Sequence, residues 1–201
     1  MSINVCNNNS MSAITSLPSG VGGGSLNLIS TQTASSSSTI SFTSGIDSTY
    51  KEYIFKFINI HPATNDQFFV FNGSSDSGSN YNLTKTTTFF EAQHDEADSA
   101  TQLSYRTADD IAQGTGFQRL LRNIGNGNDE NASGYLHLFD PSNTTFVKHF
   151  IGVGSSYYAE DYEFNSYYAG YFNTTSAIDA IQFKMESGNI DSGTIKLYGV
   201  S

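Results

Sequence analysis

Charged residues are scarce in this chain, and their signs are unbalanced. Asp, Glu, Lys and Arg make up 14% of its 201 residues, against about 25% in an average soluble domain. Few residues are of the helix-favouring types, which argues against a helical bundle, a coiled coil or a long series of βαβ units. Nine basic residues against 19 acidic ones give a formal net charge of −10. Because phosphate-binding surfaces need clustered Lys and Arg, we expect no nucleic acid and no membrane among the partners.

Cysteine and long apolar segments are also nearly absent. The single cysteine, Cys6, excludes an internal disulfide and a cysteine-rich zinc site. No apolar run reaches the ~20 residues that cross a bilayer. The first residues, MSINVCNNNS, lack the basic and apolar regions of a secretory signal. We therefore expect synthesis in a reducing cytoplasm and a role as a soluble or assembled protein.

Small polar and aromatic residues fill the composition instead. Ser, Thr and Asn account for 66 of the 201 residues, and the chain has 12 Tyr and 15 Phe. Tyr, Phe and Thr favour strands, whereas Ser, Asn and Gly favour turns. Disordered chains are poor in aromatic residues. The composition therefore predicts a folded protein of the all-β class.

Alternation of apolar and polar residues predicts about ten strands with turn-forming residues between them, and hence an antiparallel β-sandwich of jelly-roll type. The segment from Tyr50 to Ile60 is apolar on both faces over most of its length, which predicts a central strand covered on both sides. The segment from Thr107 to Arg122 predicts a loop with one short turn of helix. The expected strands are residues 26–28, 40–42, 50–60, 68–71, 84–92, 135–139, 145–153, 162–172, 178–185 and 194–198.

The chain divides into two unequal parts. Residues 1–24 hold the run Asn7–Asn9, Pro18 and the glycine-rich stretch from Gly20 to Gly24. Such a segment cannot form a core of its own, so it predicts an extended N-terminal arm with a flexible hinge. Residues 25–201 form the predicted β-sandwich domain. The arm is expected either to be a disordered tail or to become ordered against a neighbouring subunit.

Two acidic segments invite a metal-binding interpretation. His94 stands beside Asp95, Glu96 and Asp98, but an acidic run before Ser and Thr is typical of a solvated loop. The loop from Gly125 to Asn131 offers oxygen ligands but lacks the ligand spacing and closing glutamate of a calcium-binding EF-hand. We expect ordinary turn chemistry there, with Asn and Gly at positive φ, and we predict no metal site.

No set of residues predicts catalysis. The segment from Gly152 to Ser156 lacks the spacing of a nucleophile elbow, and Cys6 lies outside the predicted domain. The acidic residues Glu160, Asp161 and Glu163 could serve as a glycosidase pair only if their separation in space allowed it. The Asp76-Ser77-Gly78 segment is interpreted as a hairpin turn. We therefore predict a protein that is not an enzyme and has no cofactor and no catalytic residues.

Aromatic residues cluster near the C-terminal third, where neighbouring rings such as Tyr167 and Tyr168 can face opposite sides of one strand. We interpret this series as core plus interface, because Tyr is favoured in protein contacts. A sugar-binding face is the alternative. The series comprises Tyr157, Tyr158, Tyr162, Phe164, Tyr167, Tyr168, Tyr171 and Phe172.

Three segments carry a resemblance to a known family. They are SFTSGIDSTYKEYIF, within the longer stretch from Ser30 to Thr64, LHLFDPSNTTFVKHF from Leu136 to Phe150, and the closing GTIKLYGV. From about residue 25 onward the chain resembles small all-β virion proteins of tailed bacteriophages, many of them from marine bacteria and cyanobacteria. Members of this family look like capsid decoration proteins or tail-fibre pieces, and the family offers no catalytic residues to carry over.

The resemblance implies a structural protein on the exterior of a virion, made in the host cytoplasm. A tail fibre needs an attachment region, a long shaft and a tip, whereas one domain and one arm suit a decoration, or cement, protein. We therefore expect binding to the major capsid protein and self-association as a homotrimer, since local three-fold positions offer equal sites. The alternative is a tail-fibre or receptor-binding tip that recognises a host surface glycan.

Overall fold

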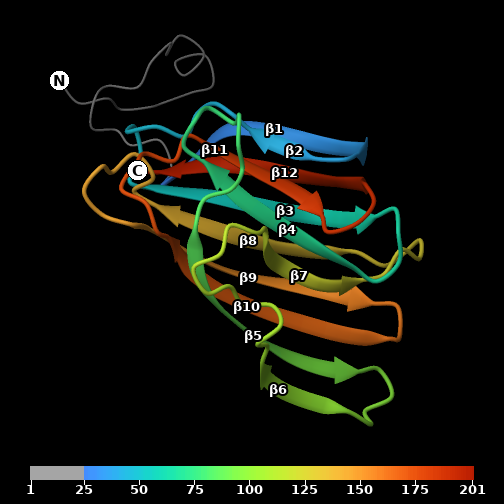
Figure 1. Ribbon diagram of the computed structural model, residues 1–201. Coiled ribbons are helices and arrows are strands. Elements are labelled where there is room, and N and C mark those ends of the chain that lie inside the picture. Colours follow the sequence, from blue (N-terminus) through green and yellow to red (C-terminus); the bar gives the residue numbers. More distant parts are fainter. Residues whose placement is uncertain (1–24) are drawn as a thin grey trace, which may run out of the picture.

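The computed structural model describes residues 25–201 as an all-β protein (Figure 1). The arm and hinge predicted for residues 1–24 lie outside this described part. None of the described residues belongs to a helix that could span a membrane. The twelve strands are β1 (Leu26–Ser37), β2 (Ile40–Phe42), β3 (Glu52–Pro62), β4 (Gln67–Ser74), β5 (Lys85–Asp95), β6 (Thr101–Tyr105), β7 (Gln118–Ile124), β8 (Ala132–Phe139), β9 (Lys148–Tyr158), β10 (Tyr162–Phe172), β11 (Ala180–Met185) and β12 (Ile190–Val200).

The strands form two antiparallel sheets that pack as a sandwich, as the sequence predicts. The larger sheet has eight strands in the order β1-β12-β3-β8-β9-β10-β5-β6, and the smaller has four in the order β2-β11-β4-β7. In Figure 1 the smaller sheet lies over one part of the larger one, and β5 and β6 extend beyond it. One face of the larger sheet therefore points into the sandwich, and the other points away from it.

Four of the strand pairs are nested along the chain. β1 pairs with β12, β2 with β11, β3 with β8, and β4 with β7. The remaining four strands, β5, β6, β9 and β10, all join the larger sheet. Nested pairing agrees with a jelly roll, but a simple jelly roll has only eight strands. The jelly-roll type therefore stays a prediction.

The core is an aromatic cluster centred on Phe183 of β11. The ring of Phe183 lies 5.2 Å from the rings of Phe55 and Phe57 in β3, and 5.6 Å from the ring of Phe69 in β4. All four side chains are almost completely buried. Because burying a side chain of this size contributes about 1.5–3 kcal/mol, these contacts hold the two sheets together.

The structure corrects the predicted elements between residues 101 and 124. β6 and β7 were not expected, so the predicted count of about ten strands becomes twelve. The segment from Thr107 to Arg122 forms no helical turn; its last five residues belong to β7. The Asp76 turn also does not connect a hairpin, because β4 and β5 belong to different sheets.

The prediction that β3 is covered on both sides is wrong. Phe55 and Phe57 face the core, but Ile58 is 39% exposed on the opposite face. The register shifts between Phe57 and Ile60, with Asn59 at a φ of 51°, and this shift turns the buried Ile60 to the core side. An apolar outward face of the larger sheet, rather than a second covering layer, explains the sequence pattern.

Candidate interaction face

The acidic segment after β5 forms a tight turn. Asp95 accepts hydrogen bonds from the backbone N–H groups of Ser99 and Ala100, and the hydrogen bond from the Ser99 side chain holds the pKa of Asp95 below its usual range. His94 pairs with Asp98 at 3.1 Å, and the Asp98 side chain is 92% exposed. Within residues 25–201 no three His, Cys, Asp or Glu side chains are grouped to hold a metal ion.

The loop from Gly125 to Asn131 is organised by a carboxylate that faces inward. Glu130 accepts a hydrogen bond from the backbone N–H of Gly127, and a Cβ at Gly125 would come within 2.1 Å of the same carboxylate. The prediction of positive φ for the Asn and Gly residues of this loop is wrong; Asn123, just before it, has a φ of 48°. The two glycines make room for Glu130.

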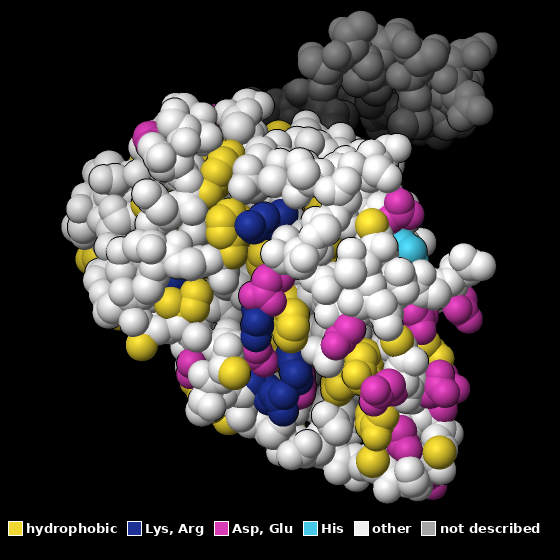
Figure 2. Space-filling model, turned by 45° about the vertical axis from the view of Figure 1, so that its right-hand side comes forward, with side chains coloured by type: hydrophobic (Ala, Val, Ile, Leu, Met, Phe, Trp, Pro, Cys, Tyr) yellow, Lys and Arg dark blue, Asp and Glu magenta, His cyan; other side chains and the backbone are white. Residues whose placement is uncertain are grey.

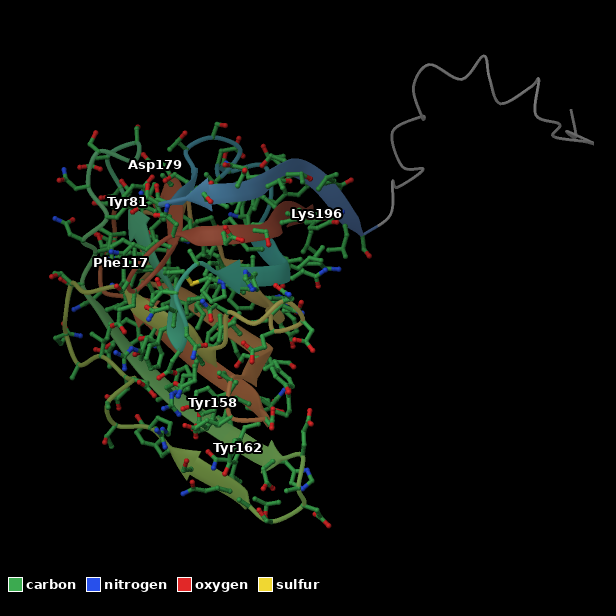
Figure 3. The ribbon with its side chains drawn as sticks, turned by 90° about the vertical axis from the view of Figure 1, so that its right-hand side faces the viewer. Tyr81, Phe117, Tyr158, Tyr162, Asp179 and Lys196 are labelled. Carbon is green, nitrogen blue, oxygen red and sulfur yellow. The ribbon has the colours of Figure 1, made fainter. Side chains whose placement is uncertain are left out.

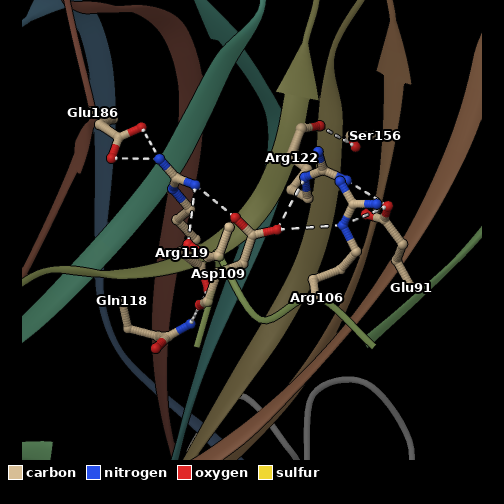
Figure 4. A network of polar contacts seen from close by, with 9 residues as sticks. Glu91, Arg106, Asp109, Gln118, Arg119, Arg122, Ser156 and Glu186 are labelled. Carbon is tan, nitrogen blue, oxygen red and sulfur yellow. Dashed lines mark hydrogen bonds and ion pairs between the residues drawn. The ribbon is translucent and has the colours of Figure 1, made fainter. Parts of the chain in front are cut away.

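All three arginines of the chain meet in one network that joins β7 of the smaller sheet to β5 of the larger one (Figure 4). Arg119 Nη1 lies 2.6 Å from Asp109 Oδ1, and Arg122 Nε lies 3.2 Å from Asp109 Oδ2. Arg122 Nη1 also contacts Glu91, whose side chain is fully buried. Arg106 Nε lies 3.4 Å from the same Glu91 oxygen.

The network is electrically balanced, because Arg119 also binds both carboxylate oxygens of Glu186 at 2.7 and 2.9 Å. Three guanidinium groups thus face three carboxylates. Figure 2 shows basic side chains in a narrow band between acidic and apolar ones. Buried charges are tolerated when they are paired in this way. We interpret the network as a structural connection between the two sheets.

Two buried lysines lie on either side of Phe172 in the larger sheet. Lys85 Nζ donates to the carbonyls of Leu83 at 2.9 Å and Gly116 at 2.6 Å, and burial lowers the pKa of Lys85 to about 7. Lys148 Nζ donates to the carbonyl of Thr174 at 3.1 Å. Both amines are bound to backbone carbonyls, so they fix the starts of β5 and β9, the two strands that flank β10.

The face of the larger sheet that points away from the smaller one, here called the open face, gathers exposed apolar side chains. Side chains alternate between the two faces of a strand, so the residues beside the buried positions point outward. Among residues 25–201, nine of the ten large apolar side chains that are exposed lie on this face: Leu26, Leu28, Ile58, Phe90, Leu103, Tyr105, Tyr135, Ile151 and Tyr167. Exposed apolar patches of this kind mark interaction sites.

Aromatic residues form a row across the strands of the open face. Tyr105, Phe90, Tyr167, Val153 and Tyr135 follow one another from β6 to β8 in register. The rings of Phe90 and Tyr167 stack at 4.8 Å with an interplanar angle of 2°. The hydrogen bond that Tyr105 donates to Asp110 raises the pKa of the tyrosine. These contacts hold the row in a fixed arrangement.

The predicted alternation of the aromatic series is confirmed. Tyr167 is 37% exposed on the open face, whereas Tyr168 is 2% exposed and donates a hydrogen bond to the carbonyl of Tyr135 at 2.7 Å. Phe164 and Phe172 are also buried. Tyr158 and Tyr162 lie near the end of the sheet, where β9 meets β10 (Figure 3). The prediction that part of the aromatic series belongs to the core is confirmed. The prediction that the other part forms an interface stays a prediction.

Smaller side chains beside the aromatic row leave a trough of about 520 Å³ on the open face. Thr88, Ala169 and Ile151 are in register across β5, β10 and β9, and Tyr171 and His149 follow on the next row. The trough offers threonine hydroxyls and aromatic rings. It contains no carboxylate, and its one titratable side chain besides Tyr171 is His149.

Few charges lie on the open face. Glu52 is in contact with His137 on the neighbouring strand. Lys56 of β3 and Lys196 of β12 are direct partners in the register, and Lys56 Nζ lies 5.3 Å from the centre of the Tyr198 ring. Partial desolvation raises the pKa of Glu163, which is exposed on this face near the β9–β10 turn. In a chain with 19 acidic residues, this face is therefore poor in negative charge.

Comparison with family models, curated proteins and solved structures finds no match for this chain. The resemblance to virion proteins therefore gains no support from these comparisons and stays a prediction. The open face was only partly visible in the sequence. Its signal was the apolar outward positions of β3, such as Ile54 and Ile58, which were assigned to a second buried face instead.

Proposed function

We propose that this chain is a non-enzymatic structural protein that binds a protein partner through the open face of its larger sheet. The observation that carries the proposal is the concentration of nine exposed large apolar side chains on one face. An interface core is depleted of charge and enriched in Tyr and Phe, and the open face has both properties. The paired carboxylates of the buried network and the hydrogen-bonded acidic turn support a structural role.

The specific role that we propose is decoration of a bacteriophage head. In this role the open face binds the outer surface of the major capsid protein, and the chain assembles as a homotrimer on the exterior of the virion. The rigid two-sheet domain and its acidic surface fit such an exposed position. The basis for this specific role is a resemblance to virion proteins, carried by the segments around SFTSGIDSTYKEYIF and LHLFDPSNTTFVKHF.

Quantitative mass spectrometry of purified virions tests the role. We expect a copy number that matches the major capsid protein in a fixed ratio, and a trimer when the purified protein is measured by light scattering. A handful of copies per particle, or labelling of the tail by a specific antibody, would contradict decoration.

Substitutions on the open face test whether this face is the binding surface. The double variant Tyr135→Ser/Ile151→Ser should bind particles at least ten-fold more weakly than the wild type. Phe117→Ser is the matched control, because Phe117 packs against Lys184 of the smaller sheet. Equal binding by both variants would exclude the open face as the binding surface.

A second candidate function is glycan recognition by a tail-fibre tip. The trough favours it, because aromatic rings beside threonine hydroxyls suit a sugar. A glycan array separates the two functions: the candidate requires binding to a defined glycan that is lost in Ala169→Phe, where a ring would fill the trough. Decoration predicts no such binding.

A further inference from the structure

Two lysines face each other near one side of the open face. Lys56 of β3 and Lys196 of β12 are paired directly across the antiparallel register. The neighbours of each lysine along its strand are buried in the core, so both amines point to the open face. Figure 3 shows Lys196 on the opposite side of the sandwich from Phe117.

These lysines lack the partners that the other cations have. The three arginines belong to the buried network, Lys51 pairs with Asp140 at 2.9 Å, and Lys85 and Lys148 are fully buried. Within residues 25–201, only Lys56, Lys184 and Lys196 remain exposed to some extent without a carboxylate in ion-pair distance. Two of these three cations are adjacent, although the chain has 19 carboxylates.

The arrangement is unfavourable for the isolated domain. Like charges directly opposite one another destabilise a strand pair. Glu52, the acidic residue of β3, lies two outward positions from Lys56 and is already in contact with His137. The ring of Tyr198 attracts Lys56 but does not neutralise it. A bound group that brings negative charge would remove the repulsion.

We infer that Lys56 and Lys196 form an anchoring site for the carboxylates of an acidic segment on a partner protein. This inference rests on the proposed function of the open face. Tyr135 lies next to Lys56 in the register, and Tyr198 lies beside Lys196, so the site offers two cations among aromatic rings. Charge complementarity of this kind fixes register and partner choice. A nucleic acid does not fit, because two cations on a chain of charge −10 cannot offset the repulsion of its phosphates.

The variant Lys56→Glu distinguishes a loss of binding from a loss of folding, because it should weaken binding without lowering the stability of the domain. The new carboxylate would face Lys196, so the variant should unfold at the same or a higher urea concentration than the wild type. Binding to particles should weaken at least ten-fold, since the partner's carboxylates would then meet a negative charge. Lys184→Glu is the matched control, since it changes a lysine on the smaller sheet and should leave binding within two-fold of the wild type.

A second probe makes the test independent of the phage. The full chain is titrated with a copolymer of glutamate and tyrosine, with polyglutamate and a lysine–tyrosine copolymer as comparisons. We expect binding of the glutamate–tyrosine copolymer that falls as salt rises and is lost in Lys56→Glu but kept in Lys184→Glu.

The outcomes distinguish the inference from the proposed function. If the chain binds no particles but binds the copolymer through its lysines, the head-decoration role fails and the anchoring site stands. If Lys56→Glu binds particles and copolymer like the wild type, the anchoring site is overturned and the open face can still stand. If the lysines support only self-association, the partner-protein assignment is overturned in favour of a second copy of the chain.

Discussion

Glu91 is a single residue that binds two of the three arginines of the network. Its side chain is fully buried and contacts Arg106 and Arg122. The substitution Glu91→Ala would remove one of the two carboxylates that these guanidinium groups contact and leave Asp109 as the other, and breaking a buried pair in this way costs about 3–5 kcal/mol. Urea denaturation should therefore show a large loss in the free energy of unfolding.

Glu186 provides the control at the edge of the same network. It pairs with Arg119, but its side chain is 47% exposed, and exposed pairs contribute about 0–1 kcal/mol. Glu186→Ala should therefore cost far less than Glu91→Ala. Equal losses in the two variants would contradict the structural role that we assign to the buried carboxylate.

Lys85 gives the stability of the fold a dependence on pH. Burial lowers the pKa of Lys85 to about 7 in the folded protein, whereas an unfolded chain has a lysine pKa of about 10.4. Between these values the unfolded chain binds more protons, so the free energy of unfolding should rise as the pH increases above 7. Urea denaturation between about pH 7 and 9 should show this rise.

The variant Lys85→Met tests whether Lys85 causes this pH dependence. The quantity that decides is the slope of the free energy of unfolding against pH, rather than its absolute value. The variant loses two hydrogen bonds to carbonyls and should be less stable than the wild type at every pH. Its free energy of unfolding should rise less between pH 7 and 9. Lys184→Met, outside the core, should keep the slope of the wild type, and an unchanged slope in Lys85→Met would refute the prediction.

At the scale of a single element, β9 is shaped by glycines that let its neighbours approach closely. A Cβ at Gly152 would come within 2.2 Å of the Tyr168 ring and 2.4 Å of the Tyr135 carbonyl oxygen. Gly152→Ala should therefore cost at least about 2 kcal/mol through overpacking. At Gly116 a Cβ would meet nothing within 4 Å, so Gly116→Ala should change stability by less than about 1 kcal/mol. Thermal unfolding of both variants measures the difference.

The elements that the sequence predicted well alternate between buried and more exposed side chains over most of their length, as in β5 and β10. β7 was missed because Leu120 and Leu121, together with Ile111 and Phe117, imitate a helical period across two glycines. β6 was missed because its five residues carry no buried side chain that would mark an inward face. Short edge strands depend on the neighbouring strand for their conformation, and the local sequence does not contain that information.

The buried network was beyond sequence reasoning for a related reason. Glu91 and Arg122 are 31 positions apart, and their meeting depends on how β7 of the smaller sheet packs over β9 and β10 of the larger one. The open face was partly predictable, because alternation placed Tyr167 and Tyr168 on opposite sides. Which side would be covered depended on the extent of the smaller sheet, and this extent follows from long-range pairing.

For the molecule as a whole, the net charge of −10 opposes the approach of a second copy. Salt screens such repulsion, with a Debye length of about 10 Å at 0.1 M and about 3 Å at 1 M. Self-association of the chain should therefore increase with salt, in contrast to binding at the two lysines. Sedimentation velocity at low and high salt measures the assembled fraction, and a fall with rising salt would contradict the prediction.

The ion pairing of all three arginines and the burial of two of the six lysines have a consequence for resistance to proteases. Trypsin cleaves after Lys and Arg and needs an exposed, extended backbone, which strands held in a sheet do not offer. Lys51, in the segment before β3, is the basic residue most open to attack, with a side chain that is 77% exposed. The folded domain should thus persist where trypsin-like enzymes are abundant, although its sequence contains nine potential cleavage sites.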